Sequence, residues 1–159
     1  MITETDILAA LNDVCDPEIP ALSVVELGLI AAVQVGEDSA QVKMTPTFAG
    51  CPAVEMMRCA MEERLRGLGL AEVKVSITYD PPWNSNRITP EGRRKLKEFG
   101  LAPPAPYTGE LNLIQIVDAR CPFCDSYNTS LESPFGPTLC RAIHYCYDCQ
   151  QSFEQFKPV

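Results

Sequence analysis

Two short cysteine motifs, CPFC at residues 121–124 and CYDC at residues 146–149, decide the fold of the C-terminal part of the chain. A two-residue gap lets both thiolates of one turn reach the same ion, and a second such turn completes a tetrahedral set of sulfur ligands. The segments between the motifs alternate in the manner of short strands. The pattern predicts an all-β zinc ribbon with a structural zinc, because four thiolates leave no open coordination position. The four candidate ligands are Cys121, Cys124, Cys146 and Cys149.

Other uses of this region stay open. A redox dithiol also has a CxxC motif, but no βαβ pattern surrounds either copy here. Iron can occupy the same four thiolates in a rubredoxin-like site. Cys140 and His144 are further candidate ligands, although the paired motifs already satisfy a tetrahedral metal. Residues 111–117 alternate and predict a strand that leads into the first motif.

Three prolines within residues 103–106 mark a connector, because proline cannot donate a backbone hydrogen bond and favours an extended chain. We therefore expect a first domain over residues 1–100, a Pro-rich linker over residues 101–109 and the ribbon over residues 110–159.

The first domain has the pattern of a small α+β fold. Helices are predicted where apolar residues recur three or four apart, and strands where apolar and polar residues alternate. A hairpin, a helix and a third strand form a small α/β sandwich, in which a short sheet carries helices on one face. The predicted elements are a helix over 4–14, a hairpin over 29–35 and 40–45, a helix over 52–67, a strand over 71–79 and a helix over 89–99. The predicted inner residues of the third strand are Val73, Val75, Ile77 and Tyr79.

The segment MTPTFAGCPA, residues 44–53, contains the most informative single cysteine. Pro52 is expected as the first residue of the helix, which places Cys51 at the N-cap. There the unpaired backbone N–H groups and the positive end of the helix dipole favour thiolate over thiol. We therefore predict that Cys51 is reactive or binds metal; a small buried packing residue is the alternative. Cys59, inside the same helix, is expected to be buried.

Two groups of charged residues are open to two interpretations each. Asp16 and Glu18 lie in a loop that two prolines hold extended, and they either supply oxygen ligands or are solvated acids at a helix end. A basic cluster on the last helix of the first domain is either a solvated face or a docking site for an acidic partner. Its members are Arg87, Arg93, Arg94, Lys95 and Lys97.

Composition narrows the class of protein. The chain has 159 residues, 46% of them hydrophobic and 21% charged, as in soluble globular proteins. No apolar run approaches the ~20 residues of a membrane span, and the N-terminus has no secretory pattern, so we expect a cytoplasmic protein. In that reducing compartment eight cysteines favour metal binding over disulfides. A net charge of −8 argues against nucleic acid as a partner.

Several motifs in the first domain together resemble the metal–sulfur cluster assembly domain family. They are DPEIP (16–20), VVELGL (24–29), TPTFAGCPA (45–53) and PPW (81–83). The further order of linker, CPFC, FGPTLC (135–140), CYDC and a terminal FK (156–157) resembles the D-subunit family of phenylacetyl-CoA epoxidase systems. The resemblance covers nearly the whole chain.

The resemblance implies an accessory protein, and not an enzyme, in aerobic phenylacetate catabolism. Such a protein would help to mature iron–sulfur or other metal centres of a multicomponent monooxygenase, with a ferredoxin-type reductase or a di-iron oxygenase subunit as its client. The family's functional cysteine matches Cys51, its motif acids match Asp16 and Glu18, and its fifth ribbon cysteine matches Cys140. Cys51 would then be a transient ligand of a cluster or of iron.

The resemblance also bears on the oligomeric state and on two other possible functions. Two chains can offer two Cys51 thiolates to one cluster, so a homodimer is expected to form. The alternative function is a structural, non-catalytic subunit of the oxygenase complex. A thiol enzyme is disfavoured because Cys51 lacks a partner base; the single histidine, His144, lies in the ribbon.

The sequence departs from the family pattern at two places. Glu26 stands where an aspartate is usual, a tolerable change if the carboxylate only accepts hydrogen bonds. After Trp83, Asn86 replaces an expected acid and Arg87 replaces an expected aromatic residue.

Overall fold

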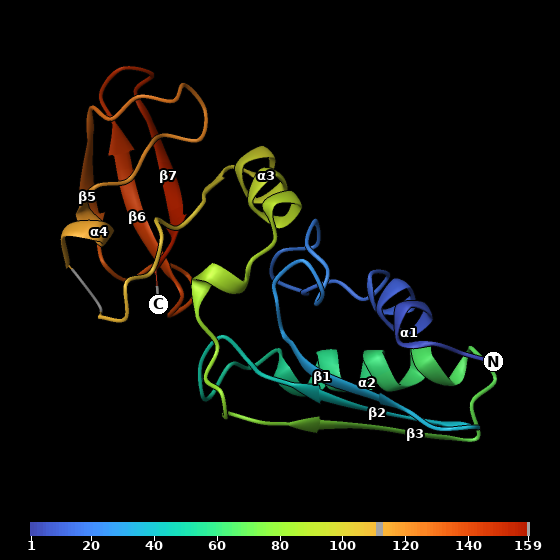
Figure 1. Cartoon of the computed structure of the whole chain (residues 1–159). Helices are drawn as coiled ribbons and strands as arrows, with labels where there is room; N and C mark the ends of the chain where they lie inside the picture. Colours follow the sequence, from blue (N-terminus) through green and yellow to red (C-terminus); the bar gives the residue numbers. More distant parts are fainter. Residues whose placement is uncertain (111–112, 159) are drawn as a thin grey trace. The chain divides into compact units, whose positions relative to one another are not determined.

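The computed structural model describes residues 1–110 and 113–158 and divides the chain into two compact units, Met1–Trp83 and Asn84–Val159 (Figure 1). Each unit has its own sheet: one with three strands and one with four. No helix in the described part of the chain is long and apolar enough to cross a bilayer.

The unit Met1–Trp83 is an α+β sandwich of the expected kind, but the helix predicted over 89–99 belongs to the other unit. Its sheet has the order β1-β2-β3, with β1 and β2 antiparallel and β2 and β3 parallel. A parallel pair needs a crossover, and α2 supplies it. Both helices lie on the same face of the sheet (Figure 1). The elements are α1 (Glu4–Leu11), β1 (Ile30–Val35), β2 (Ser39–Met44), α2 (Val54–Arg66) and β3 (Glu72–Ile77).

The apolar stripe of α2 explains how this unit forms its core. Val54, Met57, Met61 and Leu65 recur every three or four residues, and all four are buried. Cys59 lies on the opposite side of the helix and is exposed, so the prediction that it is buried was wrong. The reason is the helical period: position 59 lies off the stripe that faces the sheet.

The third strand is less buried than the alternation predicted. Val75 is 4% exposed, but Ile77 and Tyr79 are 37% and 53% exposed. β3 is an edge strand, so only β2 lies beside it, and it ends at Ile77. Ile77 is therefore at the corner of the sheet and Tyr79 lies beyond the end of the strand, where both are open to solvent. The predicted burial of Ile77 and Tyr79 was therefore wrong.

Glu62 joins α2 to this edge strand. Its Oε1 accepts a hydrogen bond from the backbone N–H of Val75 (3.1 Å), and its carboxylate pairs with Arg58 (2.8 Å) and Arg66 (3.0 Å). The Val75 N–H, together with the two guanidinium groups, lowers the pKa of Glu62. The ionised carboxylate therefore stabilises the fold more than the protonated acid does.

We expect Glu62→Ala to lower the free energy of unfolding by about 1–3 kcal/mol at pH 7, because the N–H of Val75 loses its acceptor. A pKa that is lower in the folded chain gives stability above the ordinary value of about 4.3, and this stability is lost as pH falls through the folded value. The difference between wild type and variant should therefore shrink below about pH 4. Urea unfolding followed by the fluorescence of Trp83, the single tryptophan, measures both effects. Glu63→Ala, an exposed neighbour, is the control; an equal loss there would contradict the assignment.

The unit Asn84–Val159 contains a four-stranded sheet with the order β4-β7-β6-β5. β5, β6 and β7 are antiparallel neighbours, which confirms the predicted β-rich ribbon. The elements are η1 (Ser85–Arg87), α3 (Pro90–Phe99), β4 (Leu101–Ala102), α4 (Leu113–Val117), β5 (Thr129–Ser133), β6 (Arg141–Cys146) and β7 (Gln151–Phe156).

Two segments of this unit differ from the sequence-based expectation. Residues 101–102, expected to begin a linker, form β4 and pair with Glu154 and Gln155 of β7. The expected strand over 111–117 is the helix α4 over Leu113–Val117, while residues 111–112 lie outside the described range. The apolar pattern of so short a segment fits either period, and the burial of Ile116 within a helix resolves it.

Candidate functional site

The four cysteines of the two CxxC motifs converge on one point. Their sulfur atoms lie within 4.8 Å of one another, with Sγ–Sγ distances of 3.7 Å for Cys121 and Cys149 and 3.5 Å for Cys124 and Cys146. A tetrahedral zinc with Zn–S bonds of 2.3 Å requires sulfur atoms about 3.8 Å apart. The four sulfurs therefore form a metal-binding group whose geometry suits zinc.

Each motif ends in the same backbone turn. The residue directly after the second cysteine is left-handed in both motifs: Asp125 has φ 62° and Gln150 has φ 57°. In the first turn, the N–H of Asp125 also donates to the carbonyl of Cys121 (3.0 Å). Two local turns of one kind thus present two pairs of thiols.

The environment of these thiols favours a bound cation. Backbone N–H groups of Cys149 and Asp148 lower the pKa of Cys146 to about 7. Burial and the neighbouring cysteines raise the pKa of Cys149 to about 12. Four adjacent thiolates repel one another, so all four ionise together only when a metal balances their charge.

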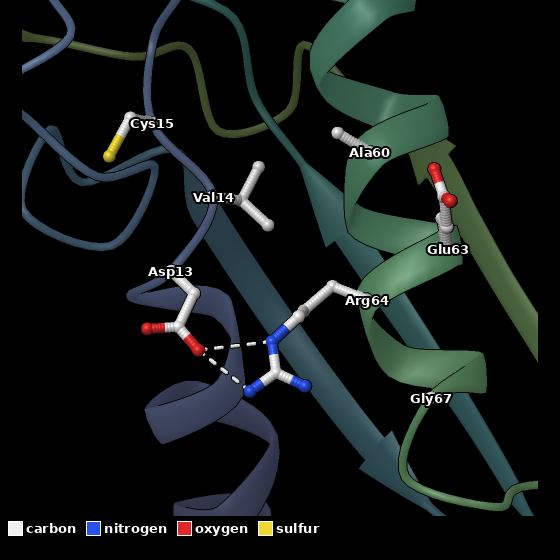
Figure 2. Close-up of a pocket in the computed structure, with 7 residues that line it drawn as sticks. All are labelled: Asp13, Val14, Cys15, Ala60, Glu63, Arg64 and Gly67. Atoms are coloured by element: carbon white, nitrogen blue, oxygen red, sulfur yellow. Dashed lines mark hydrogen bonds and ion pairs between the residues drawn. The ribbon is translucent and has the colours of Figure 1, made fainter.

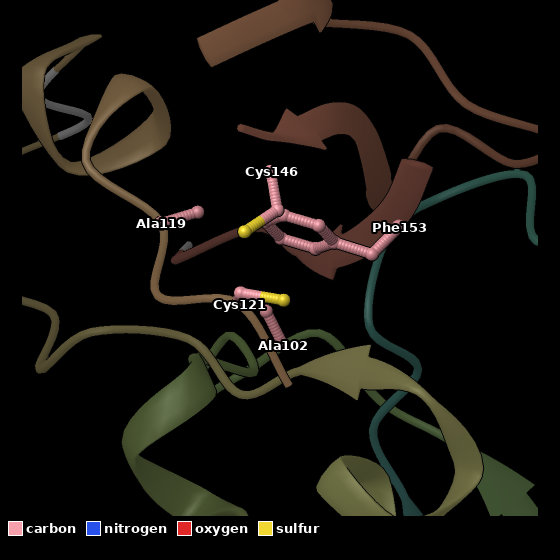
Figure 3. Packing of buried hydrophobic residues seen from close by; sticks show 5 residues of the cluster. All are labelled: Ala102, Ala119, Cys121, Cys146 and Phe153. Carbon is pink, nitrogen blue, oxygen red and sulfur yellow. The ribbon is translucent and has the colours of Figure 1, made fainter. Parts of the chain in front are cut away.

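Two of the four ligands belong to the core of the unit. Cys121 and Cys146 are fully buried and pack with Ala102, Ala119 and Phe153 (Figure 3). The metal-binding group therefore replaces part of a hydrophobic core that this small unit otherwise lacks.

Cys140 and His144 lie outside the four-sulfur group. Cys140 Sγ is 3.1 Å from the hydroxyl of Thr138. His144 is fully buried, stacks on Phe153 with ring centroids 5.3 Å apart, and has its Nε2 2.9 Å from Oε1 of Gln155. Burial lowers the pKa of His144, which favours the neutral imidazole. Its surroundings are those of a core residue.

Cys51 lies beside the start of α2, though not at the N-cap. The N-cap is Ala53, whose φ of −82° and ψ of −10° are already near helical, and the N–H of Val54 donates to the carbonyl of Cys51 (3.3 Å). A turn thus precedes the helix and moves its start two residues beyond the predicted position. Gly50 has φ +92°, a conformation that favours glycine. Cys51 is half-buried and lies within one turn of the positive helix end.

Asp16 organises the loop that follows α1. Its Oδ1 accepts hydrogen bonds from the backbone N–H groups of Glu18 (2.7 Å) and Ile19 (3.2 Å), and the residue is 9% exposed. Within the described residues, the one group of three or more cysteine, histidine or acidic side chains close enough to share a metal is that of the four ribbon cysteines. The structure thus does not gather Cys51, Asp16 and Glu18 into a preformed metal site.

Comparison with known proteins agrees with this division into two units. The family model described as "Iron-sulfur cluster assembly protein" matches residues 4–77, and the model described as "PaaD zinc beta ribbon domain" matches residues 112–157. A protein of Escherichia coli (strain K12), named as the D subunit of a "Putative 1,2-phenylacetyl-CoA epoxidase", is 39% identical over 97% of this chain and 92% of its own length. The chain belongs to the PaaD family.

Other relatives of this PaaD-family chain match about three fifths of its length. A "Fe-S protein maturation auxiliary factor" of Porphyromonas gingivalis is 38% identical over 59% of this chain and 90% of its own length. Among solved structures, a conserved hypothetical protein of Thermotoga maritima has a TM-score of 0.52 with 38% identity, over 60% of this chain and 94% of its own. A DUF59 domain of Bacillus anthracis has a TM-score of 0.55 with 29% identity, over 58% and 90%.

The structure accounts for two of the departures from the family pattern. Oε2 of Glu26 accepts from the N–H of Ser23 (2.9 Å), and the hydroxyl of Ser23 accepts from the N–H of Glu26 (3.0 Å), so the carboxylate serves as a hydrogen-bond acceptor. Asn86 donates to the carbonyl of Tyr107 and accepts from its N–H, both at 2.8 Å. An ionised acid at position 86 can only accept, so the amide suits this exchange.

Two members of the basic cluster of this PaaD-family chain, Arg94 and Lys97, form ion pairs with neighbouring acids. Arg94 pairs with Glu91 and Glu98, and Lys97 pairs with Asp125 (2.6 Å). Arg93 instead donates to the carbonyls of Ser85 (2.9 Å) and Pro104 (2.6 Å), where burial lowers its pKa. Arg93, Arg94 and Lys97 are therefore engaged within their own unit.

The structure also reveals a hollow that the sequence did not indicate. It has a volume of about 440 Å³ and lies between the end of α1 and the C-terminal half of α2 (Figure 2). Arg64 and Asp13, which both line it, form an ion pair (2.7 Å), and Cys15 is a further lining residue. These paired residues are 51 positions apart, so no local pattern could have shown them together. The lining residues are Asp13, Val14, Cys15, Ala60, Glu63, Arg64 and Gly67.

Proposed function

We propose that this chain is an accessory maturation factor, and not an enzyme, for iron–sulfur or other metal centres of a phenylacetyl-CoA epoxidase system in the cytoplasm. The observation that carries the proposal is the separation of the sulfurs. Four are gathered into a closed metal-binding group in the ribbon. Cys51 belongs to the other unit, which matches the iron–sulfur assembly model, and it is half-buried beside a helix start.

In this proposal the ribbon group holds zinc as a structural ion, because four thiolates leave it no reactive position. Cys51 binds an iron–sulfur cluster or iron transiently as cargo. Transfer is ligand exchange: the iron–sulfur bond to Cys51 breaks as a bond to a client thiolate forms, with no change of oxidation state. Asp16 takes a supporting part by fixing the loop that carries Glu18.

The expected clients are the ferredoxin-type reductase or the di-iron oxygenase subunit of the same system. Support comes from the names of the relatives: one is called a subunit of the epoxidase and another a maturation factor for iron–sulfur proteins. A cluster held between two chains would need a Cys51 from each, which makes a transient homodimer part of the proposal.

The substitution Cys51→Ser tests this function. We expect the iron and sulfide content of the co-expressed reductase to fall severalfold, because serine is a much poorer ligand for iron than a thiolate. Cys59→Ser, at an exposed cysteine of the same unit, is the matched control and should leave the cluster content unchanged. Trp83 fluorescence confirms that both variants are folded. A normal cluster content with folded Cys51→Ser protein would refute cluster transfer.

A structural subunit of the oxygenase complex is the second candidate, favoured by the word "subunit" in the name of the Escherichia coli relative. In that case the chain should co-purify with the oxygenase in a fixed stoichiometry, and Cys51→Ser should leave that stoichiometry unchanged. A transient maturation factor should be absent from the purified complex.

A further inference from the structure

The distribution of cations in the unit Met1–Trp83 is uneven. The unit carries 13 acidic side chains and five basic ones. All three arginines lie on α2 and are paired: Arg58 with Glu55 and Glu62, Arg64 with Asp13, and Arg66 with Glu62. The other two cations are Lys43 and Lys74, and neither side chain forms an ion pair or hydrogen bond with any residue that the structure describes.

The two lysines lie together on the open face of the sheet. Along β2, Val42 and Met44 are buried beneath the helices, whereas Gln41 and Lys43 point to the other face and are exposed. The strand register pairs Gln41 with Lys74 and Lys43 with Ser76. Lys43 and Lys74 are therefore diagonal neighbours on adjacent strands, within reach of one another and of a shared ligand.

These residues border a hollow of about 220 Å³ built by all three strands. Its other polar groups are amides and a hydroxyl, which can donate hydrogen bonds to an anion. Its lining residues Gln41 and Lys43 alternate along β2 with the buried Val42 and Met44, so the hollow lies on the sheet face opposite the core. The lining residues are Ala32, Gln34, Gln41, Lys43, Lys74 and Ser76.

We propose that this open sheet face is a docking surface for an acidic, carboxylate-rich segment of a partner protein. Charge complementarity carries the argument. Two neighbouring ammonium groups repel each other, and a carboxylate placed between them relieves that repulsion while accepting hydrogen bonds from both. The rest of the unit is strongly acidic, so an acidic segment is repelled elsewhere and is directed to this one face. The inference does not depend on Cys51.

A short acidic segment fits this surface better than a nucleic acid does. A phosphate backbone extends over many charges and would meet the acidic remainder of the unit, whereas a few glutamates can lie on the sheet face alone. By strand alternation Glu72 lies on the same face as Lys74, opposite Ser39 at the start of the strand, and it limits the cationic surface on that side.

Binding of a fluorescein-labelled hexaglutamate peptide to the full-length protein, measured by anisotropy at low salt, tests the proposal. We expect K43Q/K74Q to weaken binding by about tenfold or more, and E72Q to strengthen it, since like charge near the ligand is removed. The control R94Q/K97Q makes the same change of net charge on α3. It should leave the affinity within about twofold of wild type.

Several results would overturn the proposal. They are an absence of hexaglutamate binding to wild type, an undiminished affinity of K43Q/K74Q, or an equal loss in R94Q/K97Q, which would show a mere effect of net charge. Sedimentation of wild type and K43Q/K74Q provides a further test. A dimer that the double substitution dissociates would show that a second copy of this chain occupies the face in place of a partner. Because neither lysine side chain has a partner in the described structure, K43Q/K74Q should unfold at the same urea concentration as wild type.

Discussion

Removal of the metal from the four-cysteine group with a chelator is expected to unfold Asn84–Val159 while Met1–Trp83 stays folded. Cys121 and Cys146 are part of the buried cluster of their unit, so loss of the metal exposes core as well as ligands. Without the metal, burial keeps the Cys149 thiol protonated. No cation then holds the four sulfur atoms together. A structural zinc supplies about 10–16 kcal/mol, which equals or exceeds the stability of most domains.

The chain offers a separate reporter for each unit. Trp83 is the single tryptophan and belongs to the first unit, so its fluorescence follows that unit alone. Amide NMR signals from the strands β5, β6 and β7 follow the second. We expect chelation to abolish the dispersed signals of these strands and leave the urea midpoint of Trp83 unchanged. Cys146→Ser should reproduce the effect of chelation, whereas Cys59→Ser should not. A shift of the Trp83 midpoint on chelation would show that the two units do not unfold independently.

Trp83→Ala is expected to lower the free energy of unfolding of the first unit by about 3–5 kcal/mol, the range for deletion of a large buried aromatic side chain. Trp83 is 6% exposed, and its indole N–H donates to the carbonyl of Leu27 at 2.9 Å. This bond joins the last residue of the unit to a segment 56 positions earlier. The alanine variant loses both the packing of the ring and the hydrogen bond.

Trp83→Phe separates these two contributions. It keeps most of the ring and removes the N–H, so about 1–3 kcal/mol should be lost because the buried carbonyl of Leu27 loses its donor. Urea unfolding followed by circular dichroism is the measurement, since the variants lack the fluorophore. Tyr79→Ala is the control: its side chain is 53% exposed, and a change within about 0.5 kcal/mol is expected. A loss for Trp83→Ala no larger than that of the control would show that Trp83 does not anchor the unit.

The candidate sites show how far local patterns reach. The CxxC spacing predicted the four-cysteine group. The two residues between the cysteines of each motif fix a local turn, and this turn directs both thiols to the same side. The helical period predicted the buried stripe of α2 in the same way. The start of that helix was predicted two residues too early, because Pro52 and Ala53 form a turn that local preferences do not distinguish from the first helical turn.

The sequence by itself determined the α+β class, the β-rich ribbon and the membership of the four-cysteine group, since each depends on residues close together in the chain. Tertiary structure alone decided that residues 101–102 join the sheet of the ribbon and that residues 113–117 are helical. It also brought Lys43 beside Lys74, and Arg64 against Asp13. These outcomes depend on strand register and on contacts between distant elements, which the periodicity of a single segment does not encode.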